Sequence, residues 1–171
     1  MRLGNPNHGG LAELRLGITG CGRVVELGYL PALAENLGFK LVALADPDAG
    51  RRGEIARQAE RALGAAPALF DTDEALLDAA EIDVLLVSNP VQDHFASAAA
   101  AVAADVPALI EKPPVETSDE AAALATLGSR VWVGFNRRFG IAEDLKGKLP
   151  ADGFLDVEME LHYRRTSWGA Y

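Results

Sequence analysis

Short apolar runs alternate with helical patterns along most of this 171-residue chain. The run 39–45 is almost wholly apolar, which is typical of a parallel strand covered on both faces. Strand and helix patterns alternate six times, and this predicts a doubly wound parallel sheet of the α/β class with right-handed crossovers. The six expected strands are residues 15–19, 39–45, 68–70, 82–87, 106–110 and 131–135.

The helical segments carry start and stop signals. The first helix is expected to begin near Arg23, and Pro31 within it should kink or divide it. The second is expected over 50–63 and to end at Gly64. Two later helices show the residue spacing of capping boxes, Asp71 with Glu74 and Thr117 with Glu120. The inward positions of the first helix are predicted to be Val24, Leu27, Leu30 and Leu33.

The pattern changes after Gly140. Apolar and polar residues alternate over 153–165, which predicts a long half-buried strand of an antiparallel sheet. A single long strand without a partner either joins a sheet edge or opens a second domain. We therefore expect a disordered leader over 1–13, an α/β domain over 14–139 and the beginning of a truncated α+β domain over 140–171.

Composition narrows the possible partners. The net charge of −9 argues against nucleic acid and anionic membrane surfaces. Cys21 is the only cysteine, which excludes an internal disulfide and a cysteine-based zinc site, and no metal site is predicted. The chain has no apolar run long enough for a membrane span and no signal-peptide pattern. A reducing, cytoplasmic location is expected.

A glycine turn, Gly20-Cys21-Gly22, links the first strand to the first helix. Glycines permit a tight turn and close approach of the backbone, and a helix N-terminus offers N–H groups to an anion. The turn therefore predicts a phosphate cradle, although an ordinary strand–turn–helix would show the same short pattern.

Asp46 ends the second strand. In a dinucleotide-binding fold an acid here accepts hydrogen bonds from the adenosine ribose and repels a 2′-phosphate. A strand-stopping Asp-Pro turn is the plainer alternative. Arg51 and Arg52 follow, either as a site for a 2′-phosphate or as a solvated helix face. NAD is the expected cofactor, and NADP remains open.

Further motifs follow the later strands in a definite order. They are Asn89-Pro90 with His94, Glu111-Lys112-Pro113, and Gly134-Phe135-Asn136-Arg137-Arg138-Phe139. Together with Gly20-Cys21-Gly22-Arg23-Val24, Leu30-Pro31-Ala32-Leu33 and Asp46, this series resembles the Gfo/Idh/MocA oxidoreductases, relatives of glucose–fructose oxidoreductase and inositol dehydrogenase. The resemblance covers 14–138, and it implies that 14–139 is a dinucleotide-binding Rossmann domain.

The resemblance implies a role for each motif. Gly20 and Gly22 would cradle the pyrophosphate, and Asp46 would hold the adenosine ribose. The remaining cofactor-binding residues would be Cys21, Arg23 and Val24 in the turn, Asn89, Pro90 and His94 on the nicotinamide side, Glu111 and Lys112 at the nicotinamide, and Arg137 at the junction with the substrate domain. Lys112 would also be the catalytic residue, oriented toward the substrate hydroxyl, where a lysine can hold a developing alkoxide.

A full-length relative would transfer hydride between NAD and a hydroxyl carbon of a sugar, cyclitol or related polyol, and would be a homo-oligomer. The chain departs from the family pattern at Val25 and Tyr29. It also lacks the family's downstream Asp-x-x-x-His motif, so we expect it to bind the nucleotide without full catalytic machinery. A non-catalytic NAD-binding sensor or assembly module is the alternative. Glu111-Lys112-Pro113 argues against a methyltransferase. Cys21 is expected to be a packing residue rather than a reactive thiol.

Overall fold

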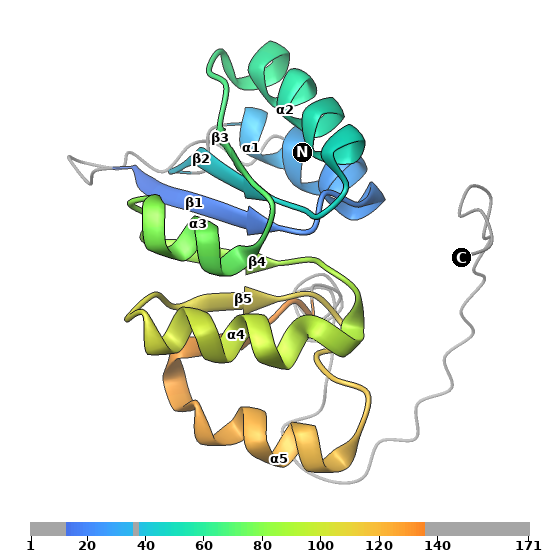
Figure 1. Cartoon of the computed structure of the whole chain (residues 1–171), viewed down its shortest axis with the longest axis vertical. Coiled ribbons are helices and arrows are strands. Elements are labelled where there is room, and N and C mark those ends of the chain that lie inside the picture. Colours follow the sequence, from blue (N-terminus) through green and yellow to red (C-terminus); the bar gives the residue numbers. More distant parts are fainter. Residues whose placement is uncertain (1–12, 36–37, 136–171) are drawn as a thin grey trace, which may run out of the picture. The chain divides into compact units, whose positions relative to one another are not determined.

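A single six-stranded parallel sheet forms the centre of the described structure (Figure 1). The computed structural model describes residues 13–35 and 38–135, which belong to the first of two compact units of the chain. The strand order is β3-β2-β1-β4-β5-β6, and every neighbouring pair is parallel, which confirms the predicted doubly wound α/β class. The strands are β1 (Leu14–Thr19), β2 (Phe39–Ala45), β3 (Ala68–Phe70), β4 (Val84–Val87), β5 (Ala108–Ile110) and β6 (Val131–Val133).

Helices cover both faces of the sheet. On one face lie η1 (Val25–Tyr29), α1 (Leu30–Ala34) and α2 (Ala49–Leu63), and on the other lie α3 (Asp73–Ala79), α4 (His94–Ala103) and α5 (Ser118–Thr126). The side chains of successive residues in a strand point to opposite faces of the sheet, as the strand geometry requires. Leu86 belongs to the first core and Leu85 to the second. Short 3₁₀ turns, η2 (Val91–Asp93) and η3 (Gly128–Arg130), precede α4 and β6.

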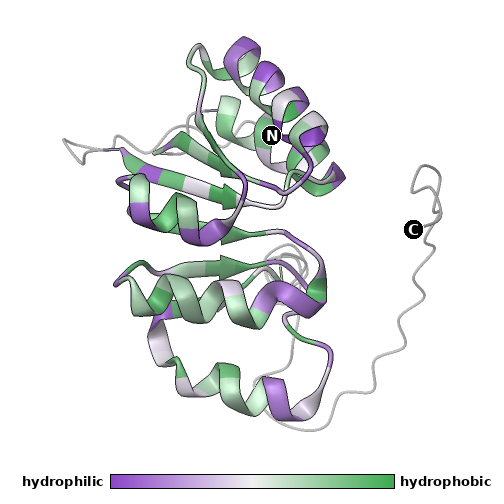
Figure 2. Cartoon of the chain, in the orientation of Figure 1, coloured by the Kyte–Doolittle hydropathy of each residue, from purple (hydrophilic) through white to green (hydrophobic). Residues whose placement is uncertain are grey.

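The apolar strands and the amphipathic helices explain this layering. Figure 2 shows largely hydrophobic strands between the helices, and hydrophilic residues over much of α2. Of α2, only Ile55 and Ala59 are buried, one turn apart on the same face. Among the described helices, none is both long and apolar enough to cross a membrane.

The first helical segment differs from the expectation. A π-helical turn occupies Val25–Tyr29 before the α-helix begins at Leu30. The wider turn rotates the buried face, so that Val25 is 0% exposed whereas Leu27, predicted to point inward, is 59% exposed. The helical residues run without a break from Arg23 to Ala34, so the expected division at Pro31 is not found, and only the bonding changes, from π-helical to α-helical, at Leu30 just before the proline.

The observed helix ends confirm two of the predicted start and stop signals and show that one predicted cap is wrong. The Thr117–Glu120 capping box is present, and α2 ends at Gly64 in the left-handed conformation. The predicted cap at Asp71 is wrong, because Thr72 has the extended backbone of an N-cap and accepts from the Ala75 N–H. Asp71 instead forms an ion pair with Arg52 at 2.5 Å.

Arg15 ties the start of β1 to the segment before β4. Its backbone N–H donates to Asp83 Oδ2 at 2.7 Å, and its guanidinium contacts the same carboxylate through Nε at 3.1 Å and Nη2 at 2.9 Å. Glu81 adds a further ion pair at 2.6 Å. The bonds from Arg15 lower the pKa of Asp83 from 3.8 to about 2.

We expect the Asp83 carboxylate to make the free energy of unfolding depend on pH in the acidic range. Because its pKa is lower in the folded state, its contribution is present above about pH 4 and disappears as the pH falls toward 2. Asp83→Asn should be less stable than wild type at neutral pH and should lose this part of the acid dependence, measured by urea unfolding across the pH range. Asp78→Asn, an exposed change of the same charge on α3, is the control. Parallel curves for wild type and Asp83→Asn would contradict the assignment.

Some predictions fall on other parts of the chain. Residues 1–12 of the predicted leader lie outside the described residues, as do Arg137 and the strand predicted over 153–165. Of the leader, only Glu13 is described. The division of the chain at 139 therefore stays a prediction.

Candidate functional site

The predicted site residues gather at the carboxyl edge of the sheet. Gly20 follows β1, Asp46 follows β2, Asn89 lies just beyond β4 and Glu111 follows β5. β1 and β4 are neighbours in the sheet, although β2 and β3 lie between them in sequence. This is the topological switch point, where open α/β sheets bind their ligands.

Gly20 lets two of these loops touch. Its φ is +87°, and a Cβ there would lie 2.4 Å from Asn89 N and 2.5 Å from Ser88 O. Its N–H donates to Ala45 O at 2.8 Å, which joins the turn to β2 as well. Only glycine fits both the backbone conformation and this approach. The turn after β1 and the loop after β4 are therefore in direct backbone contact.

The Asp46 carboxylate organises the same turn. Oδ2 accepts from the Cys21 N–H at 2.7 Å, and Oδ1 accepts from the Asp48 N–H at 2.8 Å. Each oxygen keeps further acceptor capacity, so a ligand hydroxyl can still donate to it. The Cys21 thiol is fully buried, and burial followed by the Asp46 charge raises its pKa to about 12. The interpretation of Cys21 as a packing residue is confirmed.

The two arginines of α2 are not a plain solvated face. Arg52 has a side chain only 13% exposed, donates to the Asp46 backbone carbonyl and pairs with Asp71. Arg51 donates to Cys21 O at 3.0 Å. Arg52 therefore braces the turn that carries Asp46, and Arg51 braces the glycine turn at Cys21. Sequence spacing could not show this, because their acceptors lie on other loops.

His94 joins two loops of the edge. The ring is 3% exposed, and its Nδ1 lies 3.0 Å from Pro113 O while Nε2 lies 2.9 Å from Asn89 O. Asn89 Nδ2 also donates to Ser97 on α4 at 2.8 Å. Since both ring nitrogens face backbone carbonyls, the imidazole fixes the loops after β4 and β5 relative to each other.

The Glu111-Lys112-Pro113 segment completes the edge. Glu111 N–H donates to Val87 O at 2.9 Å, and the peptide bond between Lys112 and Pro113 is cis. Glu111 Oε1 accepts from the Tyr29 hydroxyl at 2.5 Å. Sequence reasoning missed this bond: Tyr29 stood out only as a departure from the family pattern. Contacts at this edge thus join the loops after β1, β4 and β5: Gly20 approaches Asn89, His94 bonds with Asn89 and Pro113, and Tyr29 bonds with Glu111.

The remaining candidates surround an open turn. A Cβ at Gly22 would meet nothing within 4 Å, so this position is free for the close approach of a ligand. Arg23 and Pro90 are exposed and Val24 is half-buried. The first N–H groups of a helix have no partner within the helix, so those beyond Gly22 suit a phosphate. The donors, the open glycine and the acceptor at Asp46 together fit a dinucleotide.

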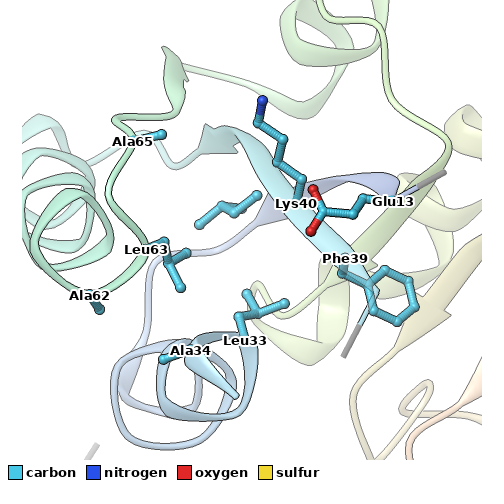
Figure 3. Close-up of a pocket in the computed structure, with 9 residues that line it drawn as sticks. Glu13, Leu33, Ala34, Phe39, Lys40, Ala62, Leu63 and Ala65 are labelled. Carbon is cyan, nitrogen blue, oxygen red and sulfur yellow. The ribbon is translucent and has the colours of Figure 1, made fainter. Parts of the chain in front are cut away.

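A separate hollow lies at the opposite, amino-terminal edge (Figure 3). Its volume is about 290 Å³, and Glu13, Phe39 and Lys40 line it together with Leu33 and Leu63 from the ends of α1 and α2. None of the candidate residues lies there. The hollow is therefore distinct from the candidate site.

Comparison with known proteins agrees with the fold. Residues 14–135 match the model of the oxidoreductase family GFO_IDH_MocA, described as having an NAD-binding Rossmann fold. The rhizopine catabolism protein MocA of Rhizobium meliloti is 30% identical over 133 residues, which cover 75% of this chain and 39% of that protein. Inositol 2-dehydrogenase of Arthrobacter sp. (strain FB24) is 31% identical over 160 residues, 90% of this chain and 46% of that protein.

A solved structure gives the same picture of the fold. An oxidoreductase from Agrobacterium radiobacter, crystallised with NAD⁺, L-tartaric acid and magnesium, superposes with a TM-score of 0.70 at 21% identity. The match covers 80% of this chain and 41% of that one. At this identity the likeness is one of fold alone. The chain spans less than half the length of the relatives described here.

Proposed function

The chain belongs to the Gfo/Idh/MocA family of NAD-binding oxidoreductases, and we propose that it forms the cofactor-binding part of a polyol dehydrogenase. Its relatives include inositol 2-dehydrogenases, so a cyclitol or related polyol is the proposed substrate class. The observation that carries the proposal is the set of contacts at the switch point that brings Gly20, Asp46 and Glu111 to one edge of the sheet.

Each residue has a distinct task in this proposal. The glycine turn and the first N–H groups of the following helix bind the pyrophosphate, and Asp46 accepts hydrogen bonds from the adenosine ribose. His94 fixes the loops on which Asn89 and Pro113 stand. NAD, when bound, supplies the acceptor for a hydride. The Lys112 ammonium orients the substrate hydroxyl and stabilises negative charge that develops on its oxygen.

NAD should be preferred to NADP. The Asp46 carboxylate stands where a 2′-phosphate would be repelled. Arg51 and Arg52, which follow it on α2, are engaged with Cys21 O, Asp46 O and Asp71. Neither guanidinium is therefore free to bind a second phosphate without losing contacts within the chain.

Direct binding to the 171-residue chain tests the proposal. We expect NADH to bind with a dissociation constant of roughly 1–100 μM and at least about tenfold more tightly than NADPH, measured by fluorescence and calorimetry. We also expect no appreciable reduction of NAD⁺ with myo-inositol or scyllo-inositol. Absence of NADH binding would refute the cofactor role. Sustained turnover by this chain would refute the proposal that it supplies only the cofactor part.

A further inference from the structure

One hydrogen bond holds the carboxylate next to Lys112 from across the sheet. The Tyr29 hydroxyl donates to Glu111 Oε1 at 2.5 Å, and these residues follow different strands, β1 and β5. The other oxygen, Oε2, accepts from the Lys112 backbone N–H at 3.1 Å. Both oxygens of the carboxylate are therefore engaged, one by a side chain and one by the backbone.

The surroundings of Glu111 hold it further in place. Its backbone N–H is bonded to Val87 O on β4. A Cβ on Gly134, after β6, would lie 3.7 Å from Glu111 Oε1, so the carboxylate rests over this glycine. Burial, followed by the hydrogen bond to Glu111, raises the pKa of the Tyr29 phenol. The phenol therefore stays protonated at neutral pH and continues to donate.

The side chain of Lys112 has different surroundings from that of Glu111. It is exposed, and within 13–35 and 38–135 it takes part in no ion pair. A carboxylate on the neighbouring residue is the nearest group in sequence that would neutralise its ammonium. A freely rotating Glu111 side chain would sample that pairing, since opposite charges near a protein surface attract. The bond from Tyr29 keeps Glu111 Oε1 occupied instead.

We propose that Tyr29 is a positioning residue. Its hydroxyl and the Lys112 backbone N–H together keep both oxygens of the Glu111 carboxylate engaged, and this leaves the Lys112 ammonium free to face a substrate. The proposal rests on the function proposed above and extends it to a residue outside the recognised motifs. Tyr29 acts through Glu111 and needs no contact with the reacting atoms. Its position at the end of the π-helical turn η1 explains how a residue of the first helix reaches the loop after β5.

A double-mutant cycle on the 171-residue chain isolates this role. Tyr29→Phe removes only the hydroxyl, and Glu111→Gln removes the charge while keeping the shape. The readout is the rate of Lys112 acetylation by acetic anhydride, measured by peptide mass spectrometry relative to Lys40, which is exposed at the other edge of the sheet. NADH affinity and the urea unfolding midpoint are measured on the same four proteins.

We expect Tyr29→Phe to lower the Lys112-to-Lys40 ratio about threefold, because the released carboxylate pairs with the ammonium. NADH affinity should fall about three- to tenfold. In the Glu111→Gln background the same change should alter neither quantity. A merely structural tyrosine would lower the unfolding midpoint and leave the ratio unchanged in the folded protein.

Two results would overturn the proposal: an unchanged ratio in Tyr29→Phe, or an equal drop in the Glu111→Gln background. Failure of the proposed function is separate, because it shows in the wild-type chain as absence of NADH binding. The lysine ratio is measured without the cofactor and decides the role of Tyr29 in either case.

Discussion

Replacing Gly20 with alanine is expected to unfold the turn on which the candidate site depends. The residue has a φ of +87°, and the new Cβ would stand 2.4 Å from both Asn89 N and Ser88 C. These are backbone atoms, so relief of the overlap requires the loop after β4 to move. A left-handed alanine costs about 1 kcal/mol, and the overlap should raise the loss of unfolding free energy to about 3 kcal/mol or more. NADH binding should be lost together with stability.

Gly22→Ala is the matched control. It makes the same chemical change two residues away, where φ is not in the left-handed region and a Cβ would meet nothing within 4 Å. Its unfolding free energy, from urea titration, should stay within about 0.5 kcal/mol of wild type. If Gly22 marks the path of the pyrophosphate, this variant should nevertheless bind NADH at least about tenfold more weakly. Equal stability of the two variants would contradict the assigned role of Gly20.

The sheet could be predicted from the sequence because its signals are local. The apolar run Phe39–Ala45 and the glycine at the end of α2 depend on neighbours a few residues away. The prediction of the buried face of the first helix was wrong because it, too, relied on a local signal. A period of 3.6 residues assigned Leu27 to the core, but the π-helical turn changed the rotation per residue, and Val25 took the buried position.

The candidate site was likewise predictable only in part. The motifs predicted which residues stand at the carboxyl edge, since each follows a strand. The partners of these residues could not be predicted, because they come from distant loops: Arg52 with Asp71, His94 with Pro113, and Tyr29 with Glu111. A hydrogen bond between residues 82 positions apart leaves no periodic trace in a single sequence. These long-range contacts therefore had to come from the structure.

Asp46 has two roles that substitutions should separate. Asp46→Ala removes the acceptor of the partly buried Cys21 N–H, whose bond to Oδ2 is 2.7 Å long. An unsatisfied buried donor should lower the unfolding free energy by about 1–3 kcal/mol. Asp46→Asn keeps one oxygen for Cys21, while the Asp48 N–H, whose bond is exposed, can turn to water. The asparagine variant should therefore retain most of the stability.

Binding should respond differently from stability. Both variants lose the carboxylate charge, and a hydrogen bond to a charged acceptor is stronger than one to a neutral acceptor. We expect both to bind NADH at least about tenfold more weakly than wild type, and neither to gain appreciable affinity for NADPH, because Arg52 stays paired with Asp71. Calorimetry with both nucleotides and urea unfolding test the two roles in the same proteins. Wild-type NADH affinity in Asp46→Asn would show that the ribose does not need this charge. Wild-type stability in Asp46→Ala would show that the Cys21 bond does not hold the turn.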